Sequence, residues 1–468
     1  MTTIARRLAD KIHAVRWDDL PLDAVHWAKI GILDTIACTL AGVPEPCTRI
    51  AMGLPGVAEA PGPALAYGGP RTSILDAALI NGVASHALDF DDVNNHIGGH
   101  PSVPLVPAIF AVADAGDGKA GGISGKDVIL AYVAGFEAET RIGRGVNHFH
   151  YEKGWHPTAT LGIFGTTAAS ARLLGLDPEQ TATALGIAVS LASGVKANFG
   201  TMTKPLHVGH SVRNGVFACL LARDGFTGNA AAFEHHQGFL QVFNGEGAHD
   251  MERGLAEWAK PWDVTSPGPN LKQYPCCGST HGAINAMLEL RRRHKIAPES
   301  VEAIQILTTP RRLPHTNNPG PKSGLEAKFS VHYCVARALI DGAVRLQHFE
   351  GGAENDAAAR ALMAKTTTGI HPDMADPAHD GYGAEVTVTL KDGTRLQYLA
   401  DGDVLRGPAY PMTGDELYEK FQDCALRAVA PADVLPLYER LMTLDDVGDA
   451  KCISDMIEGA SAAVRAAE

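Results

Sequence analysis

The feature that most limits the fold is a helical spacing of apolar residues, which continues from Pro21 to about residue 260. Its first stretch repeats apolar side chains at Val25, Ala28, Ile32, Leu33, Ile36 and Leu40. Returns after three or four residues place side chains on one face of an α-helix. Further helix starts are indicated where Ser124 precedes an apolar run and where Pro178 follows Asp177. We therefore expect one helix after another over this part of the chain.

Strand-like alternation appears only later in the chain. Residues 301–309 alternate, and residues 385–390 and 394–399 flank a Lys-Asp-Gly turn. Asp-Gly between two alternating runs is typical of a β-hairpin. Residues 326–339, between these strands, have helical spacing. This part of the chain is therefore expected to mix helix and strand.

These patterns predict a mainly α protein with two domains. Residues 1–267, completed by residues 401–468, form a large all-helical domain in this interpretation. Residues 268–400 form an inserted, smaller α+β domain that acts as a lid. The chain of 468 residues is long enough for this division, since single cores seldom grow past roughly 250–300 residues.

Charge and composition exclude several classes of partner and cofactor. The formal net charge of −13 argues against nucleic acid, whose binding needs a basic face. The eight cysteines show no CxxC spacing, which favours a reduced, cytoplasmic protein. We expect neither a secretory signal nor a membrane-spanning run of about 18 apolar residues. Dinucleotide, P-loop and α/β-hydrolase motifs do not occur, so the chemistry is expected to come from side chains without a cofactor.

The densest polar cluster of the sequence contains three carboxylates and three imidazoles. They are His86, Asp89, Asp91, Asp92, His96 and His100. These groups are metal ligands in other proteins, but the HExxH, facial-triad and EF-hand spacings are absent, and we expect no metal. The structural alternative is that Asp91 or Asp92 caps or supports the loop while His86 is a satisfied helical histidine.

Two further polar stretches stand before helical spacing. His156 directly precedes Pro157, and a helix N-terminus favours an anionic ligand beside it. The alternative for His156 is a structural loop histidine. Lys204 precedes Pro205 in a stretch that extends to Arg213. Because a residue before proline is biased away from helix, we expect Lys204 to offer its charge to a carboxylate or enolate-like oxygen, with a solvated turn lysine as the alternative.

The fourth polar stretch lies where the helical part meets the mixed part. It contains Lys272, Tyr274, Cys276, Cys277 and His281. Small-molecule clefts form at such domain junctions. Adjacent cysteines form strained disulfides and no dedicated base accompanies them, so we interpret this pair as packing or pocket lining.

These stretches, in this order, resemble the MmgE/PrpD family, which includes 2-methylcitrate dehydratase, cis-aconitate decarboxylase and iminodisuccinate epimerase. The most specific pieces are INGVASHALDFDD with HPSVPLVPA, GWHPTATLGIFG, TKPLHVGHSVRNG, KQYPCCGSTHGAI and EAKFSVHY. The resemblance covers nearly the whole chain. It implies a helical domain built from the N-terminal part and the C-terminal tail, an α+β lid, and a homodimer.

The resemblance also implies which residues form the pocket. The implied catalytic residues are Asp89, His100, His156, Lys204 and Lys272. The residues expected to bind substrate are Arg213, Tyr274, Cys277 and His281. Two positions depart from the family pattern: Val93 stands where relatives often have threonine, and Cys277 stands where the decarboxylase has a histidine-bearing version.

The reactions of this family create or quench carbanion character next to a carboxylate, which needs a base and nearby cations together. We expect Lys204 and Lys272 to hold substrate carboxylates, while His156 or the pair of Asp89 and His100 moves the proton.

The predicted function is therefore a lyase, either a dehydratase or a decarboxylase, that acts on a small di- or tricarboxylate such as 2-methylcitrate or cis-aconitate. An epimerase of an iminodisuccinate-like dicarboxylate is the first alternative. A non-catalytic binding or scaffold protein with a decayed site and a metal hydrolase are the others.

Overall fold

The computed structural model describes residues 2–116, 121–376, 381–401 and 404–467, and within these residues the fold is mainly helical. Contacts divide the chain into two compact units. The larger unit comprises Met1–Leu271 and Met412–Glu468, and the smaller unit comprises Lys272–Pro411. That the smaller unit acts as a lid stays a prediction.

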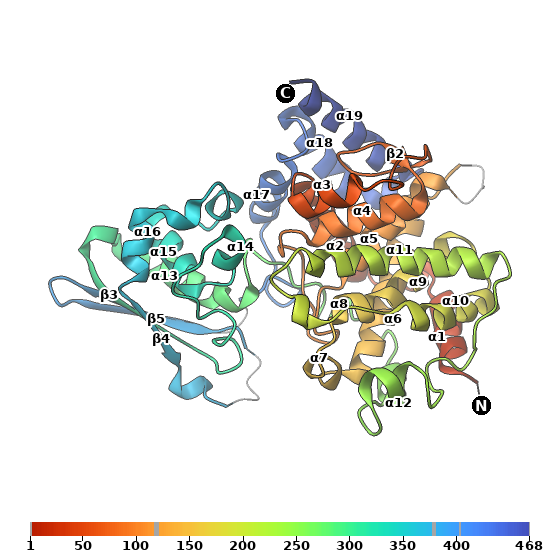
Figure 1. Ribbon diagram of the computed structural model, residues 1–468, viewed down its shortest axis with the longest axis horizontal. Helices are drawn as coiled ribbons and strands as arrows, with labels where there is room; N and C mark the ends of the chain where they lie inside the picture. The colour runs from red at the N-terminus through yellow and green to blue at the C-terminus, as the bar shows by residue number, and fades with distance from the viewer. Residues whose placement is uncertain (1, 117–120, 377–380, 402–403, 468) are drawn as a thin grey trace. The chain divides into compact units, whose positions relative to one another are not determined.

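The larger unit is a stack of helices (Figure 1). Its first helices are α1 (Ile4–Ala14), α2 (Leu22–Gly42), α3 (Pro46–Met52), α4 (Ile74–His86), α5 (Ser102–Ala115) and α6 (Gly125–Val146). They continue with α7 (Phe149–Glu152), α8 (Pro157–Thr160), α9 (Gly162–Leu173), α10 (Pro178–Leu191), α11 (Thr203–Arg223) and α12 (Met251–Ala256). A small hairpin pairs β1 (Ala64–Leu65) with β2 (Arg71–Thr72).

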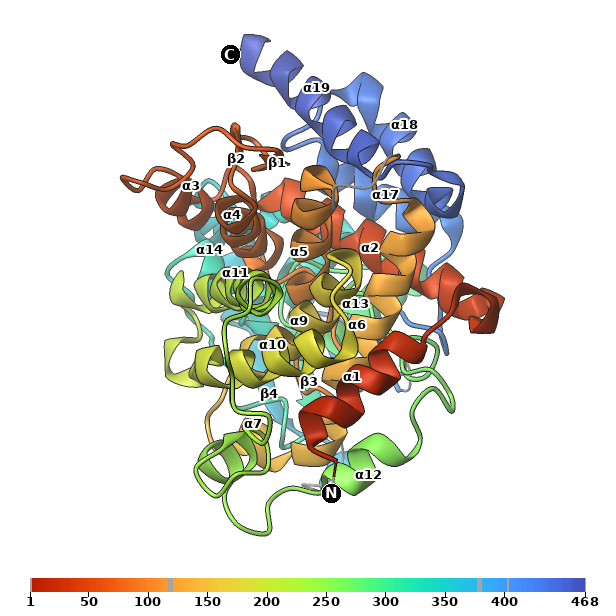
Figure 2. The same cartoon turned by 90° about the vertical axis from the view of Figure 1, so that its right-hand side faces the viewer.

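Helix α9 lies inside this stack, because α5, α6, α10 and α11 all pack against it (Figure 2). Capping fixes where several of these helices begin. Ser124 and Asp177 each form a capping box, with Asp127 and Gln180 respectively, in which side chain and backbone satisfy each other's hydrogen bonds. The helix starts expected from the sequence at these two positions are confirmed.

The C-terminal segment of the larger unit packs on its N-terminal helices. This segment consists of α17 (Gly414–Ala425), α18 (Pro431–Met442) and α19 (Lys451–Ala467), with α17 and α18 against α2. An ion pair of 2.8 Å between Lys29 Nζ and Asp445 Oδ1 joins the two parts. Chain segments from opposite ends of the sequence therefore share one core.

Helix α2 has the length and composition of a candidate membrane span, although Lys29 and Asp34 interrupt its apolar residues. In the structure 89% of the apolar window is buried inside the protein, which is how the core helix of a globular unit is placed.

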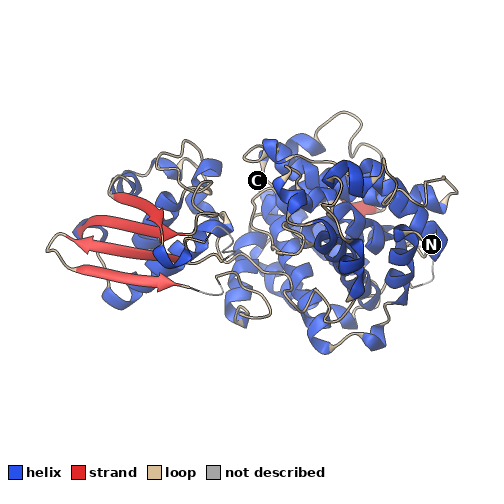
Figure 3. Ribbon diagram, turned by 90° about the horizontal axis from the view of Figure 1, so that it is seen from below, coloured by secondary structure: helices blue, strands red, loops and turns tan. Residues whose placement is uncertain are grey.

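The smaller unit has one sheet, with helices packed against it (Figure 3). Its strands are β3 (Val301–Thr308), β4 (Thr366–Ile370), β5 (Ala384–Leu390) and β6 (Arg395–Ala400), in the order β4-β3-β5-β6. Strands β3 and β4 are parallel, and the other pairs are antiparallel. Its helices are α13 (His281–His294), α14 (Gly324–Ala327), α15 (Val331–Asp341) and α16 (Ala357–Met363).

The hairpin of β5 and β6 and the strand β3 are confirmed as predicted. The single helix expected over residues 326–339 is instead two helices, because Ser330 caps a new helix through the backbone amide of Tyr333. The smaller unit extends a few residues beyond the expected boundary at 400. Arg406 Nη1 donates to Gln273 Oε1 at 3.0 Å, which keeps this segment with the smaller unit.

Candidate active site

The candidate site begins where helix α4 ends. His86 is the last residue of this helix, and Asp89 follows in the left-handed region with φ of 55°. Asparagine and aspartate adopt this conformation more readily than other residues with a side chain, and the turn redirects the chain. As a result, the next residues do not continue the helix.

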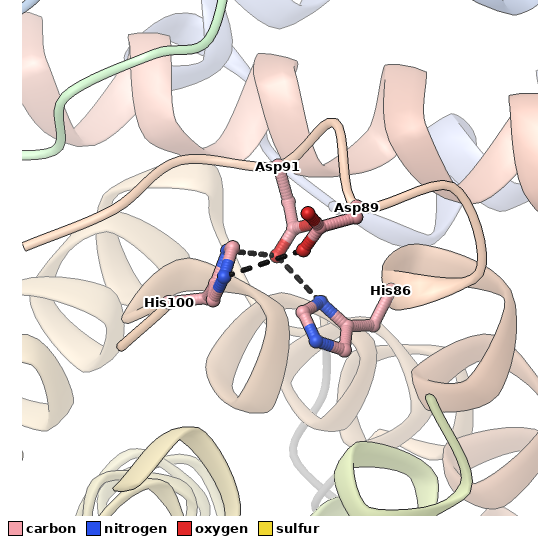
Figure 4. A group of neighbouring side chains, drawn as sticks. All are labelled: His86, Asp89, Asp91 and His100. Atoms are coloured by element: carbon pink, nitrogen blue, oxygen red, sulfur yellow. Dashed lines mark hydrogen bonds and ion pairs between the residues drawn. The ribbon is translucent and has the colours of Figure 1, made fainter. Parts of the chain in front are cut away.

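The carboxylate of Asp91 contacts two imidazoles, those of His86 and His100 (Figure 4). His86 Nδ1 lies 2.8 Å from Asp91 Oδ2, and His100 Nδ1 lies 2.8 Å from the same oxygen. Burial would raise the pKa of Asp91, but the two imidazoles outweigh it and hold this pKa well below its usual range. Burial lowers the pKa of His86 to about 4, although Asp91 opposes the shift. Asp91 is therefore ionised at neutral pH, and it orients the neutral imidazole of His86 and the ring of His100.

Lys204 reaches the same cluster from helix α11. Its Nζ donates to Asp89 Oδ1 at 2.5 Å, and His100 Nε2 lies 3.5 Å from that oxygen. Helices α4 and α11 approach closely because Gly82 faces Gly209: a Cβ at Gly82 would stand 2.8 Å from the Cα of Gly209. A residue with a side chain at either position would push these helices apart and separate Lys204 from Asp89.

His156 completes the cluster from the start of helix α8. Its ring stacks on His86 at 5.7 Å between centroids, and its Nδ1 lies 3.2 Å from His207 Nδ1. The ring edge of Phe199 contacts it at 4.8 Å. Burial, followed by the charges of His86 and Lys204, holds the pKa of His156 well below its usual range. Its Nε2 is buried and accepts no hydrogen bond from the described residues.

Asp92 supports the loop rather than the cluster. It accepts from the backbone amide of Ser102 at 3.3 Å and from Ser102 Oγ at 2.7 Å, so it caps helix α5. Tyr132 OH extends this network, 2.6 Å from Ser102 Oγ. Burial raises the pKa of Asp92 well above its usual range. The structural alternative considered from the sequence therefore applies to Asp92.

The structure thus brings together four of the predicted catalytic residues, Asp89, His100, His156 and Lys204. Their catalytic role stays a prediction. Lys204 lies in the first turn of α11 and is buried, so it is not a solvated turn lysine, and its backbone is helical despite the following proline. Arg213 lies further along α11, where its guanidinium stands 5.8 Å from the ring of Phe217.

The other predicted residues belong to the smaller unit. Lys272, its first residue, is buried. Tyr274 OH donates to Asn285 Oδ1 at 2.6 Å, and its ring meets the buried ring of His281 edge-on at 5.0 Å. Cys277 precedes a short turn of helix, and its backbone amide donates to the carbonyl of Lys328. Whether these residues contact substrate stays a prediction.

The sequence did not single out Asp91 or His207 as members of the site. Asp91 is one of three neighbouring carboxylates, and only the turn at Asp89 decides which of them meets the imidazoles. His207 follows Lys204 by three residues on α11, and this helical spacing is a signal that both side chains share a face.

A second charged group lies elsewhere in the larger unit, and two of its members, Arg141 and Arg144, line a cavity of roughly 330 Å³. Arg141 Nε donates to Glu137 Oε1 at 2.7 Å, and Arg144 grips Asp263 with two bonds of 2.6 and 3.1 Å. Glu137 also accepts the backbone amide of Asp263 at 2.8 Å. We call these four residues the arginine network. Its charges neutralise one another, as in a structural ion-pair network.

Four residues of the first cluster have the atoms of a metal site. Ligand atoms of His86, Asp89, Asp91 and His100 lie within 4.8 Å of one another. However, Lys204 Nζ forms an ion pair with Asp89, one of the four groups, so a cation held there would lie beside a like charge. The arrangement instead offers carboxylates, neutral imidazoles and an ammonium, which together suit proton transfer next to an anionic group.

Comparison with known proteins identifies the family. The model of the MmgE/PrpD N-terminal domain matches residues 6–252, and that of the MmgE/PrpD C-terminal domain matches residues 274–441. The chain belongs to the MmgE/PrpD family. The resemblance expected from the sequence motifs is confirmed.

Several characterised MmgE/PrpD proteins are similar to this chain over most of its length. Cis-aconitate decarboxylase of Homo sapiens is 29% identical over 98% of this chain and 96% of its own. Cis-aconitate decarboxylase of Aspergillus terreus is 29% identical over 92% of this chain and 91% of its own. Cis-aconitate decarboxylase of Mus musculus is 28% identical over 98% of this chain and 94% of its own.

Proposed function

We propose that the chain is a lyase that acts on a small di- or tricarboxylate, with decarboxylation of cis-aconitate as the first reaction to test. The observation that carries the proposal is the contact of Lys204 with Asp89 beside His100, next to the buried imidazole of His156. The names of three similar proteins, all cis-aconitate decarboxylases, support the choice of reaction.

In the proposed mechanism the substrate displaces Asp89 from part of the ammonium of Lys204, which then holds a substrate carboxylate. Loss of CO2 leaves an electron pair on carbon, which a neighbouring carboxylate stabilises as an enolate-like group. Lys204 offsets this charge. His156, or the pair of Asp89 and His100, then accepts a proton from water and delivers it to the carbanion. Lys272 is proposed as a second carboxylate ligand.

The buried imidazoles suit the acceptance of a proton. With pKa values below the usual range, His86 and His156 are neutral at pH 7, so each has one nitrogen able to accept a proton. The same side chains would serve dehydration, where a base removes a proton next to a carboxylate and water leaves. The reaction is therefore chosen by the substrate bound and by the geometry of its leaving group.

Incubation of the purified protein with cis-aconitate, 2-methylcitrate and iminodisuccinate in heavy water tests the proposal. NMR of the products and trapping of CO2 separate the outcomes. Loss of CO2 or of water from a tricarboxylate supports a lyase. Deuterium incorporation without either loss would replace the lyase with an epimerase, and no reaction with any of the three would reject the proposal. The homodimer and the cytoplasmic location stay predictions, and light scattering tests the first.

A further inference from the structure

A lysine from the C-terminal segment reaches the loop that carries the site. Lys420 of helix α17 is 4% exposed in its side chain, and its Nζ donates to the backbone carbonyl of Phe90 at 3.0 Å. The same Nζ lies 4.2 Å from the centre of the Phe90 ring. Phe90 stands between Asp89 and Asp91, so the lysine holds the peptide group that leads directly into Asp91.

A buried ammonium needs a compensating charge, and helix α2 supplies it. Asp34 Oδ1 lies 2.5 Å from Lys420 Nζ, and its side chain is 1% exposed. Burial alone would lower the pKa of Lys420, but the carboxylate of Asp34 outweighs it and raises this pKa. Lys420 is therefore charged at neutral pH and donates a charge-assisted hydrogen bond to the loop.

The loop needs such support because its backbone is not in a favoured conformation. Asp89 has a positive φ of 55°, which a residue with a side chain adopts less readily than glycine. Asp92 anchors the loop beyond Asp91 by capping helix α5. The bond from Lys420 anchors it before Asp91. Between these two anchors lies the carboxylate that orients both His86 and His100.

We propose that Lys420 is a positioning residue for the reaction: through the carbonyl of Phe90 it fixes the turn that aims Asp89 at Lys204 and Asp91 at the two imidazoles. This inference rests on the proposed function for its effect on turnover, but not for its effect on the loop. A buried ion pair alone is weak evidence for stability, since apolar residues often replace one without loss. The bond to the loop is what a replacement would remove.

Two double variants separate positioning from charge balance. Asp34→Asn with Lys420→Met and Asp34→Asn with Lys420→Gln both remove the buried charge pair and keep a side chain of similar size. Only glutamine can still donate to the carbonyl of Phe90, and it is one bond shorter than lysine. Lys29→Met with Asp445→Asn is the matched control, because this pair also joins α2 to the C-terminal segment.

Three measurements are made on each variant: the melting temperature, kcat and KM, and the NMR signals of the Nδ1 protons of His86 and His100. The methionine variant is expected to lose kcat about 10-fold or more with little change in KM, because small displacements of reacting groups are costly. Its histidine proton signals should shift or exchange faster. The kcat of the glutamine variant should be at least ~3-fold higher than that of the methionine variant. The control should have the kcat of the wild type.

A folded methionine variant with the kcat and the histidine signals of the wild type would overturn the inference. If the wild type turns over none of the three substrates, the proposed function is rejected, and the histidine signals alone decide about Lys420. If the variants do not fold, lysine labelled with ¹⁵N at Nζ tests the wild type. A slowly exchanging ammonium signal with an NOE to the Phe90 ring supports the inference, and its absence rejects it.

Discussion

The larger unit contains two groups of buried charges that differ in how they are satisfied. In the arginine network each guanidinium meets a carboxylate at 2.6 to 3.1 Å, and backbone amides fill the remaining positions on Glu137. In the cluster of Asp91, the imidazoles of His86 and His156 keep an Nε2 that accepts no hydrogen bond from the described residues. Proton transfer requires ring nitrogens of this kind, which are not already occupied by a hydrogen bond within the protein.

The comparison teaches that burial and charge alone do not mark a site. Both groups are largely buried, and in both the surroundings shift the pKa values of the member side chains. Burial raises the pKa of Asp263, but contacts with His96 and Arg144 outweigh it and bring this pKa to about 2. The arginine network thus holds Asp263 charged and paired, whereas the cluster holds His86 and His156 neutral. Removal of a group from the network should cost stability, and removal from the cluster should cost turnover.

The largest expected effect comes from Asp263→Ala in the arginine network. Without Asp263, the guanidiniums of Arg141 and Arg144 share the single carboxylate of Glu137, and the uncompensated charge costs roughly 3–5 kcal/mol of unfolding free energy. Urea unfolding measures this, with Glu179→Ala as control, because Glu179 pairs with Arg6 at the surface. Turnover of the folded fraction should stay close to wild type. Unchanged stability would contradict the assignment of the network as structural.

Lys204→Met should have the opposite signature in the cluster. The fold should persist, while turnover should fall by at least ~100-fold, the scale seen when one charge-stabilising donor is removed. Lys29→Met is the control, since Lys29 is also paired with an aspartate in the larger unit. Circular dichroism and kcat on the substrate found by screening decide the matter. Near-normal catalysis in a folded Lys204→Met protein would reject the proposed site.

The sequence predicted the helical part well because apolar periodicity is a local property. It did not predict strand β4, whose residues Thr366–Ile370 lack clean alternation and pair in parallel with a strand distant in sequence. Long-range pairing leaves no mark within the short strand itself. The break before Ser330 could have been anticipated from that residue's preference for the helix N-cap.

The same distinction between local and distant signals holds for the site. Asp89, His100, His156 and Lys204 stand in recognisable motifs, and the structure brings them together. Lys420 has no motif and lies in a helix far along the chain from the loop it holds. Its role depends on how α17 packs on α2, which no local pattern encodes.

The two groups should also lower the unfolding free energy of the protein in different pH ranges. His86 has a pKa of about 4 when folded against 6.5 as the ordinary value. Between these values the unfolded chain binds more protons, so the unfolding free energy falls as pH drops from 6.5 to 4, by ~3 kcal/mol. Asp263, at about 2 against 3.8, contributes stability that is lost only as pH falls from about 4 to 2, by ~2 kcal/mol.

Urea unfolding as a function of pH measures both ranges. His86→Gln should flatten the dependence between pH 6.5 and 4, and Asp263→Asn should flatten it between pH 4 and 2. Each variant is the control for the other, because each should leave the other range unchanged. A single variant that flattened both ranges would show that the two groups titrate as one, against the comparison drawn above.

The smallest expected effect is that of metal removal, although the cluster has four groups of ligand type. His86 and His100 both place Nδ1 2.8 Å from Asp91 Oδ2, and the ammonium of Lys204 forms an ion pair with Asp89. A divalent ion held by Asp89 would lie beside the like charge of Lys204, which disfavours binding. Turnover should therefore survive exhaustive EDTA treatment followed by gel filtration, and elemental analysis should find no stoichiometric metal. For the arginine network the question of a metal does not arise, because its nitrogens belong to guanidinium groups and not to imidazoles. If activity were lost on chelation and restored by one divalent ion alone, the cluster would be a metal site and the proton-transfer roles of His86 and His100 would have to be abandoned.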